Sequence, residues 1–139
     1  MPTMTVCKDV AAPADAVWAL LADFGDVRWI PMDVKVEVEG AGPGMHRKIL
    51  GSGDEPAVET LLWIKPDERR LSYEITNIPL PVDRFTAVVF VTESDGGSRI
   101  GWEVDYEPSG DDAEARGSIE LVYGMMADWL RDAATQAAS

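Results

Sequence analysis

Apolar and polar positions alternate with a period of two between residues 34 and 108, which is typical of strands that bury one face. The pattern predicts six strands there, at 34–39, 45–51, 57–64, 71–77, 84–93 and 98–107. Glycine, proline and aspartate gather in the short segments between them. A parallel crossover needs a dozen residues or more, so strands joined by such short links are antiparallel neighbours.

The chain before this region predicts one further strand and two short helices. Residues 3–10 alternate loosely and indicate a strand. Pro13 suits the first position of a helix over residues 14–24, which Gly25 ends. The apolar stripe of this helix consists of Val17, Leu20, Leu21 and Phe24. Residues 27–31 suggest a second short helix that Pro31 stops.

The last 29 residues, from position 111 on, change to helical spacing. The apolar positions that recur every three to four residues are Ile119, Val122, Met126, Trp129 and Ala133, with Tyr123 and Leu130 beside them. A helix of this length with one apolar face needs a sheet to cover it. The predicted fold is therefore α+β: seven antiparallel strands wrapped around a long C-terminal helix, with two short helices after the first strand, in a single domain over residues 1–139.

Strand parity predicts which side chains point into this fold, since alternate residues share a face. Apolar residues share one face of the strands at 71–77 and 98–107, Tyr73 and Trp102 among them. Arg47 is in phase with apolar neighbours in its strand. Glu59 is in phase with Leu61 and Trp63, although the opposite face of that strand is apolar too. Arg47 and Glu59 are the candidates for inward-pointing charges, and a solvent-facing Glu59 stays open as the alternative.

Two interpretations of these polar side chains remain open. Arg47 and Glu59 either form a structural ion pair that fixes strand register, or anchor a ligand and transfer a proton inside an apolar cavity. Tyr73 and Trp102 either pack in the core or offer their polar tips to a ligand.

Composition and charge exclude more functions than they identify. The chain has 12 Lys and Arg against 25 Asp and Glu, a net charge of −13, which a phosphate backbone would repel. We therefore expect no nucleic-acid partner, and either a solubilising acidic surface or a cationic partner. No apolar run is long enough to cross a bilayer and no secretion signal is evident, so we expect no membrane insertion and a cytoplasmic protein.

Metal and triad chemistry have little support in the sequence. His46 is the sole histidine, it is out of phase with the apolar positions of its strand, and Cys7 is the sole cysteine. We expect His46 at the surface, no metal and no cofactor. A Gly-x-Ser-x-Gly elbow is missing, and the glycine pairs lie in hairpin turns rather than at helix starts.

An ordered set of motifs resembles the START-like, birch-pollen-allergen-type superfamily, and within it the bacterial polyketide cyclase/dehydrase-like proteins. The motifs are APADAVW at 12–18 with Leu21, WIP at 29–31, GPGMHR at 42–47, ETL at 59–61, LSY at 71–73, PLPV at 79–82 and WEV at 102–104. They span almost the whole chain. The resemblance implies a helix-grip fold with a cavity between sheet and C-terminal helix.

More distantly the chain resembles lachrymatory-factor synthases and abscisic-acid receptors. In the synthases a functional arginine follows the Gly-Pro-Gly turn, where Arg47 stands, and a functional glutamate matches Glu59, although Thr60 replaces the arginine after it. The 79–82 segment resembles the receptors' gate loop. The expected ligand-binding residues are Arg47, Glu59, Tyr73, Trp102, Trp63, Pro79, Leu80, Val122 and Met126.

Three functional hypotheses follow from this. The first is a binding protein for a small hydrophobic, polyketide-like or lipid-like molecule, acting as a monomer or homodimer. The second is a cyclase, dehydratase or lyase in which Glu59 is the general acid/base and Arg47 stabilises an oxyanion. The third is an interaction module whose pocket is filled by its own side chains.

Overall fold

The computed structural model describes residues 2–25, 29–30, 35–50, 57–77 and 80–138, and these form one curved sheet and a long helix. The elements in chain order are β1 (Thr3–Val10), α1 (Ala14–Ala22), β2 (Lys35–Glu39), β3 (His46–Leu50), β4 (Ala57–Lys65), the 3-10 turn η1 (Pro66–Glu68), β5 (Arg70–Thr76), β6 (Val82–Ser94), β7 (Gly97–Pro108) and α2 (Asp112–Ala138). The strand order is β1-β7-β6-β5-β4-β3-β2, and every neighbouring pair is antiparallel.

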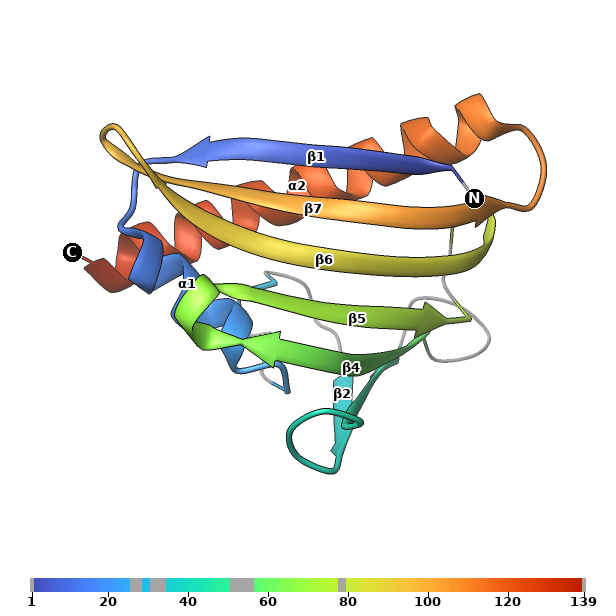
Figure 1. Cartoon of the computed structure of the whole chain (residues 1–139), viewed down its shortest axis with the longest axis horizontal. Coiled ribbons are helices and arrows are strands. Elements are labelled where there is room, and N and C mark those ends of the chain that lie inside the picture. Colours follow the sequence, from blue (N-terminus) through green and yellow to red (C-terminus); the bar gives the residue numbers. More distant parts are fainter. Residues whose placement is uncertain (1, 26–28, 31–34, 51–56, 78–79, 139) are drawn as a thin grey trace.

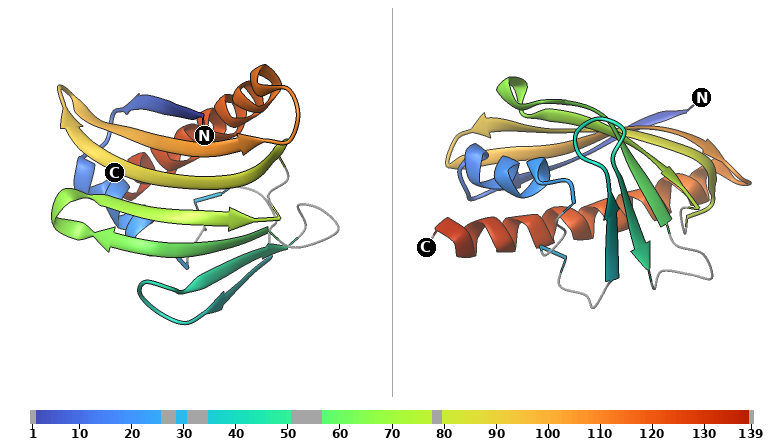
Figure 2. Two further views of the ribbon diagram at one scale, coloured as in Figure 1. Left: turned by 45° about the vertical axis from the view of Figure 1, so that its right-hand side comes forward. Right: turned by 90° about the horizontal axis from the view of Figure 1, so that it is seen from below.

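The sheet curves over α2, which lies along its concave face (Figures 1 and 2). In the view from below, β2 and β3 bend down beside the helix, while α1 lies next to the C-terminal part of α2 (Figure 2). The seven predicted strands, their antiparallel order and the long C-terminal helix are confirmed. The fold is the predicted helix-grip arrangement.

The short helices after β1 differ in part from the prediction. Helix α1 ends at Ala22, two residues before the predicted end, so that Phe24 lies in the segment beyond the helix. Trp29 and Ile30 form a turn and a bend, and the other residues of the predicted second helix lie outside the described part of the chain. The second helix therefore stays a prediction.

The buried face of α2 is shifted slightly from the predicted stripe. Its fully buried side chains are Ala115, Ile119, Tyr123, Ala127, Leu130 and Ala134. Ile119 of the predicted stripe lies on this face, and so do Tyr123 and Leu130, which were expected beside the stripe. The other members of the stripe are only partly buried: Val122, Met126, Trp129 and Ala133. Three alanines on the buried face let the helix backbone approach the sheet closely, whereas the larger predicted residues flank the contact.

The start of α2 is held to the sheet by a polar cluster. The Tyr106 hydroxyl donates to the Asp112 carboxylate at 2.5 Å, and Arg116 Nη1 donates to the same hydroxyl at 3.2 Å. Arg116 also reaches the carbonyl oxygen of Thr3 in β1. These contacts hold the N-terminal end of α2 against β7 and β1.

Within the described residues, α2 included, no helix combines the length and the apolar character needed to cross a membrane.

Candidate functional site

Arg47 and Glu59 form a buried ion pair on the concave face of the sheet. They stand directly opposite each other in the register of β3 and β4, so both side chains leave the sheet on the same side. Arg47 Nε donates to Glu59 Oε1 at 2.5 Å, and each side chain is only 8% exposed. The pairing answers the question that parity left open: Glu59 points inward.

Arg47 also binds the segment that follows α1. Its Nη1 donates to the carbonyl oxygen of Phe24 at 2.7 Å, and its guanidinium carbon lies 4.0 Å from the centre of the Phe24 ring. The centre of the Tyr73 ring is farther away, 5.8 Å from the same carbon. Arg47 therefore has three kinds of partner at once: a carboxylate, a carbonyl oxygen and aromatic faces.

Two tyrosines form a second polar group in the interior. The hydroxyls of Tyr73 on β5 and Tyr123 on α2 lie 2.9 Å apart in hydrogen-bond contact. The ring of Tyr123 stacks on Phe85 and is tilted against Trp102. Burial, and then the negative charge of Glu59, raises the pKa of Tyr73 well above its ordinary value. Burial, followed by the charges of Tyr73 and Glu59, raises the pKa of Tyr123 too, so both phenols stay protonated at neutral pH.

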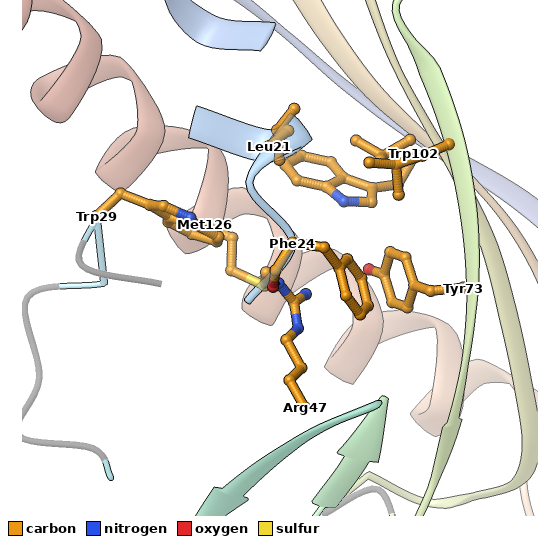
Figure 3. Close-up of a pocket in the computed structure, with 9 residues that line it drawn as sticks. Leu21, Phe24, Trp29, Arg47, Tyr73, Trp102 and Met126 are labelled. Atoms are coloured by element: carbon orange, nitrogen blue, oxygen red, sulfur yellow. The ribbon is translucent and has the colours of Figure 1, made fainter. Parts of the chain in front are cut away.

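A small cavity lies between these groups, α1 and α2 (Figure 3). Its lining residues are Leu21, Phe24, Trp29, Arg47, Leu71, Tyr73, Val89, Trp102 and Met126. The space open to the centre of a water molecule is about 10 Å³, which is room for roughly one water. In the described part of the chain, the space between these nine side chains is nearly filled, so a larger ligand has to displace some of them to enter this cavity.

The predicted site residues divide into those at this cavity and those away from it. Arg47, Tyr73, Trp102 and Met126 line the cavity, and Glu59 adjoins it through its bond to Arg47. Leu80 and Val122 pack against the core but do not line the cavity. Pro79 lies outside the described residues.

The predicted inward position of Trp63 is wrong. Leu61 pairs with Tyr73, but Trp63 pairs with Ser72, because the register of β4 shifts between these two residues. The irregularity breaks the alternation on which strand parity depends. Trp63 is therefore out of phase with Leu61 and does not line the cavity. The centre of its ring lies 4.9 Å from Lys65 Nζ.

Several lining residues were not among the predicted site residues. They are Leu21, Phe24, Trp29, Leu71 and Val89, and Tyr123 adjoins them. Leu21 and Phe24 belonged to the apolar stripe predicted after Pro13, so the sequence marked them as buried without marking them as site residues. Nothing in their spacing indicates that Phe24 meets Arg47, because the two come from different elements.

The polar groups at the cavity can hold a ligand or transfer a proton. Within the part of the chain that the structure describes, no three His, Cys, Asp or Glu side chains gather as ligands. His46 is half-buried out of phase with Arg47, and its Nδ1 lies 2.9 Å from Thr60 Oγ1. Among the residues that the structure describes, the cavity brings together the Arg47 guanidinium, the Glu59 carboxylate and the phenols of Tyr73 and Tyr123.

Comparison with known proteins gives matches over nearly the whole chain. The family model described as "Polyketide cyclase / dehydrase and lipid transport" matches residues 1–138. A solution NMR structure of a protein from Thermobifida fusca is 28% identical, covers 98% of this chain and 95% of its own, and has a TM-score of 0.78. No curated protein sequence matches the chain.

Two more distant structures share the fold. Ara h 8.0201 is 18% identical with a TM-score of 0.77, over 97% of this chain and 98% of its own. Norcoclaurine synthase from Thalictrum flavum, solved in complex with dopamine and hydroxybenzaldehyde, is 17% identical with a TM-score of 0.72, over 97% of this chain and 87% of its own. At these identities the likeness concerns the backbone arrangement alone.

Proposed function

Because the chain belongs to the polyketide cyclase/dehydrase and lipid transport family, we propose that it binds a small, mostly apolar molecule between the sheet and α2. The observation that carries the proposal is the buried Arg47–Glu59 pair beside an otherwise apolar cavity. Aromatic and aliphatic walls with a few converging polar groups are typical of small-molecule sites. Arg47 and Glu59 would orient the ligand, and the apolar lining would supply most of the binding free energy.

The ion pair supports binding because stability alone does not account for it. Removing two charges from water costs several kcal/mol per ion, and apolar replacements of similar volume are often as stable as the pair or more so. An interior with a strong hydrogen-bond donor and acceptor beside its cavity is therefore better suited to recognition than to packing.

The small volume of the cavity requires that lining side chains move when a ligand enters. Met126 is unbranched and only partly buried, and methionine side chains adapt readily to different neighbours. Phe24 and Trp29 come from the segment after α1 rather than from a strand of the sheet, so their displacement need not break strand pairing.

Adjacent methionines on α2 allow a direct test with 2-acetylnaphthalene as the ligand. Met126 lines the cavity, whereas Met125 is 41% exposed on the helix surface. In a protein labelled with methyl-13C methionine, the Met126 resonance should shift saturably with added ligand while the Met125 resonance stays in place. Equal shifts at both methyls indicate surface binding, and no shift up to the solubility limit contradicts the proposal and supports the filled interaction module.

Catalysis is a second candidate function, favoured by the carboxylate and guanidinium held together next to two phenols. Glu59 would act as general acid/base and Arg47 would stabilise an oxyanion. Native mass spectrometry of the protein from its own host would identify a retained compound to use as the substrate. Glu59→Gln should then abolish turnover while binding persists; binding with no turnover by the unmodified protein leaves carriage as the function.

A further inference from the structure

We propose that Phe24 acts as the internal ligand of Arg47, so that an external ligand has to displace it and has to carry a flat aromatic ring with a neutral acceptor oxygen beside it. This inference rests on the proposed binding function and names the class of ligand: aryl ketones, aldehydes and esters. It goes beyond that function by identifying the side chain that the ligand replaces and the chemistry that selects it.

Phe24 presents two features to the guanidinium from one residue. Its ring lies over the guanidinium at 4.0 Å, and its carbonyl oxygen accepts the Nη1 hydrogen bond at 2.7 Å. The residue is only 3% exposed although it follows the end of α1. An aromatic face together with an acceptor oxygen therefore already occupies the position that a ligand anchored by Arg47 would take.

The ring of Phe24 also takes up space within the site. It lines the cavity on one side and lies against Tyr73 on the other, with the ring centres 6.0 Å apart (Figure 3). Figure 3 shows Arg47 extending from the sheet towards Phe24, with the Phe24 ring beside that of Tyr73. Moving this ring away would add its volume to the remaining 10 Å³ and create a space bounded by a guanidinium and a phenol.

The charge balance at Arg47 selects a neutral acceptor over an anion. Glu59 already neutralises Arg47 at 2.5 Å, so a carboxylate ligand would bring a second negative charge next to Glu59 in a buried site. A purely hydrocarbon ligand would instead leave Nη1 without the partner that the Phe24 carbonyl now provides, which is unfavourable for a buried donor. A ketone, aldehyde or ester oxygen satisfies the donor without adding charge.

Displacement can be observed directly, because the chain has three phenylalanines: Phe24, Phe85 and Phe90. In protein labelled with 4-fluorophenylalanine, 19F resonances are assigned by replacing each residue in turn with leucine. Saturating 2-acetylnaphthalene should move the Phe24 resonance most and leave that of Phe90, which packs over Gly101 away from the cavity, unchanged. A Phe24 resonance that stays in place while Met126 reports binding would overturn the inference and leave the proposed function intact.

Affinities provide the second measurement. Phe24→Leu removes the aromatic contact but keeps an apolar side chain, so 2-acetylnaphthalene should bind about ten-fold more tightly because less competition has to be overcome. Phe90→Leu is the matched control and should leave the affinity unchanged. In both the wild type and Phe24→Leu, 2-ethylnaphthalene and 2-naphthoate should bind at least about ten-fold more weakly than the ketone.

Two results would contradict this proposal specifically. Equal affinities of wild type and Phe24→Leu for the ketone would show that Phe24 does not compete. Equal affinities for the ketone and 2-ethylnaphthalene would show that Arg47 does not read an acceptor oxygen. If neither ligand binds to any variant and Met126 does not respond, the proposed function fails and this inference fails with it.

Discussion

Breaking the buried ion pair should cost far more stability than removing it entirely. Glu59→Leu leaves the Arg47 guanidinium, 8% exposed, without a counter-charge; its remaining partners are the Phe24 carbonyl and two aromatic faces. An uncompensated buried charge of this kind costs about 3–5 kcal/mol. For a domain of this size that corresponds to a fall in Tm of roughly 10 °C or more.

The double variant Arg47→Met with Glu59→Leu removes both charges together. The attraction between the two charges is lost, but the cost of removing both charges from water is no longer incurred, and the two effects offset each other. The Phe24 carbonyl loses its hydrogen-bond donor, at a cost of about 1–3 kcal/mol. We therefore expect the double variant to lie within about 2 kcal/mol of the wild type. Its stability should exceed that of Glu59→Leu, the reverse of what additive effects would give.

Urea unfolding followed by tryptophan fluorescence measures the unfolding free energies of the wild type, of the single variants Arg47→Met and Glu59→Leu, and of the double variant. The m-value checks that each transition stays two-state. Glu39→Leu is the matched control, because Glu39 pairs with Lys48 on the exposed β2–β3 hairpin at 3.3 Å. Its loss should cost at most about 1 kcal/mol. Two results would refute the argument: a loss of unfolding free energy in Glu59→Leu as small as that in the control, or a loss in the double variant equal to the sum of the losses in the two single variants.

Two further predictions concern the sheet and the tyrosines. Gly97→Ala should lower the Tm more than Gly101→Ala, because a Cβ at Gly97 would strike the backbone at the end of β1 and just beyond it, whereas a Cβ at Gly101 would strike the Phe90 ring. Thermal unfolding should show that adding Phe90→Ala rescues only Gly101→Ala; rescue of both variants would contradict the assigned contacts. The unfolding free energy should fall as pH rises from about 10, because the pKa values of Tyr73 and Tyr123 are raised in the folded state and the unfolded chain therefore loses its phenol protons first. Urea titrations at several pH values should show a smaller fall when both tyrosines are replaced by Phe. The same fall in that double variant would contradict the prediction.

Strand parity predicted the interior well wherever the alternation is regular. Tyr73 and Trp102 are buried as expected, because nothing interrupts their strands between turn and turn. The prediction for Trp63 was wrong for a local reason, because the register shift after Leu61 changes the face of every later residue in β4. A one-residue irregularity of this kind leaves no clear sign in composition, so sequence pattern alone does not detect it.

Local periodicity and short connections were enough to predict the order of the elements, the antiparallel sheet, the long helix and the inward phase of Arg47. The surroundings of Arg47 depend on contacts between distant parts of the chain. Glu59 lies opposite it through strand register, and Phe24 reaches it from beyond α1. Contacts between distant segments depend on how the sheet curves and where the helices settle, and neither property is encoded in the spacing of residues within one element.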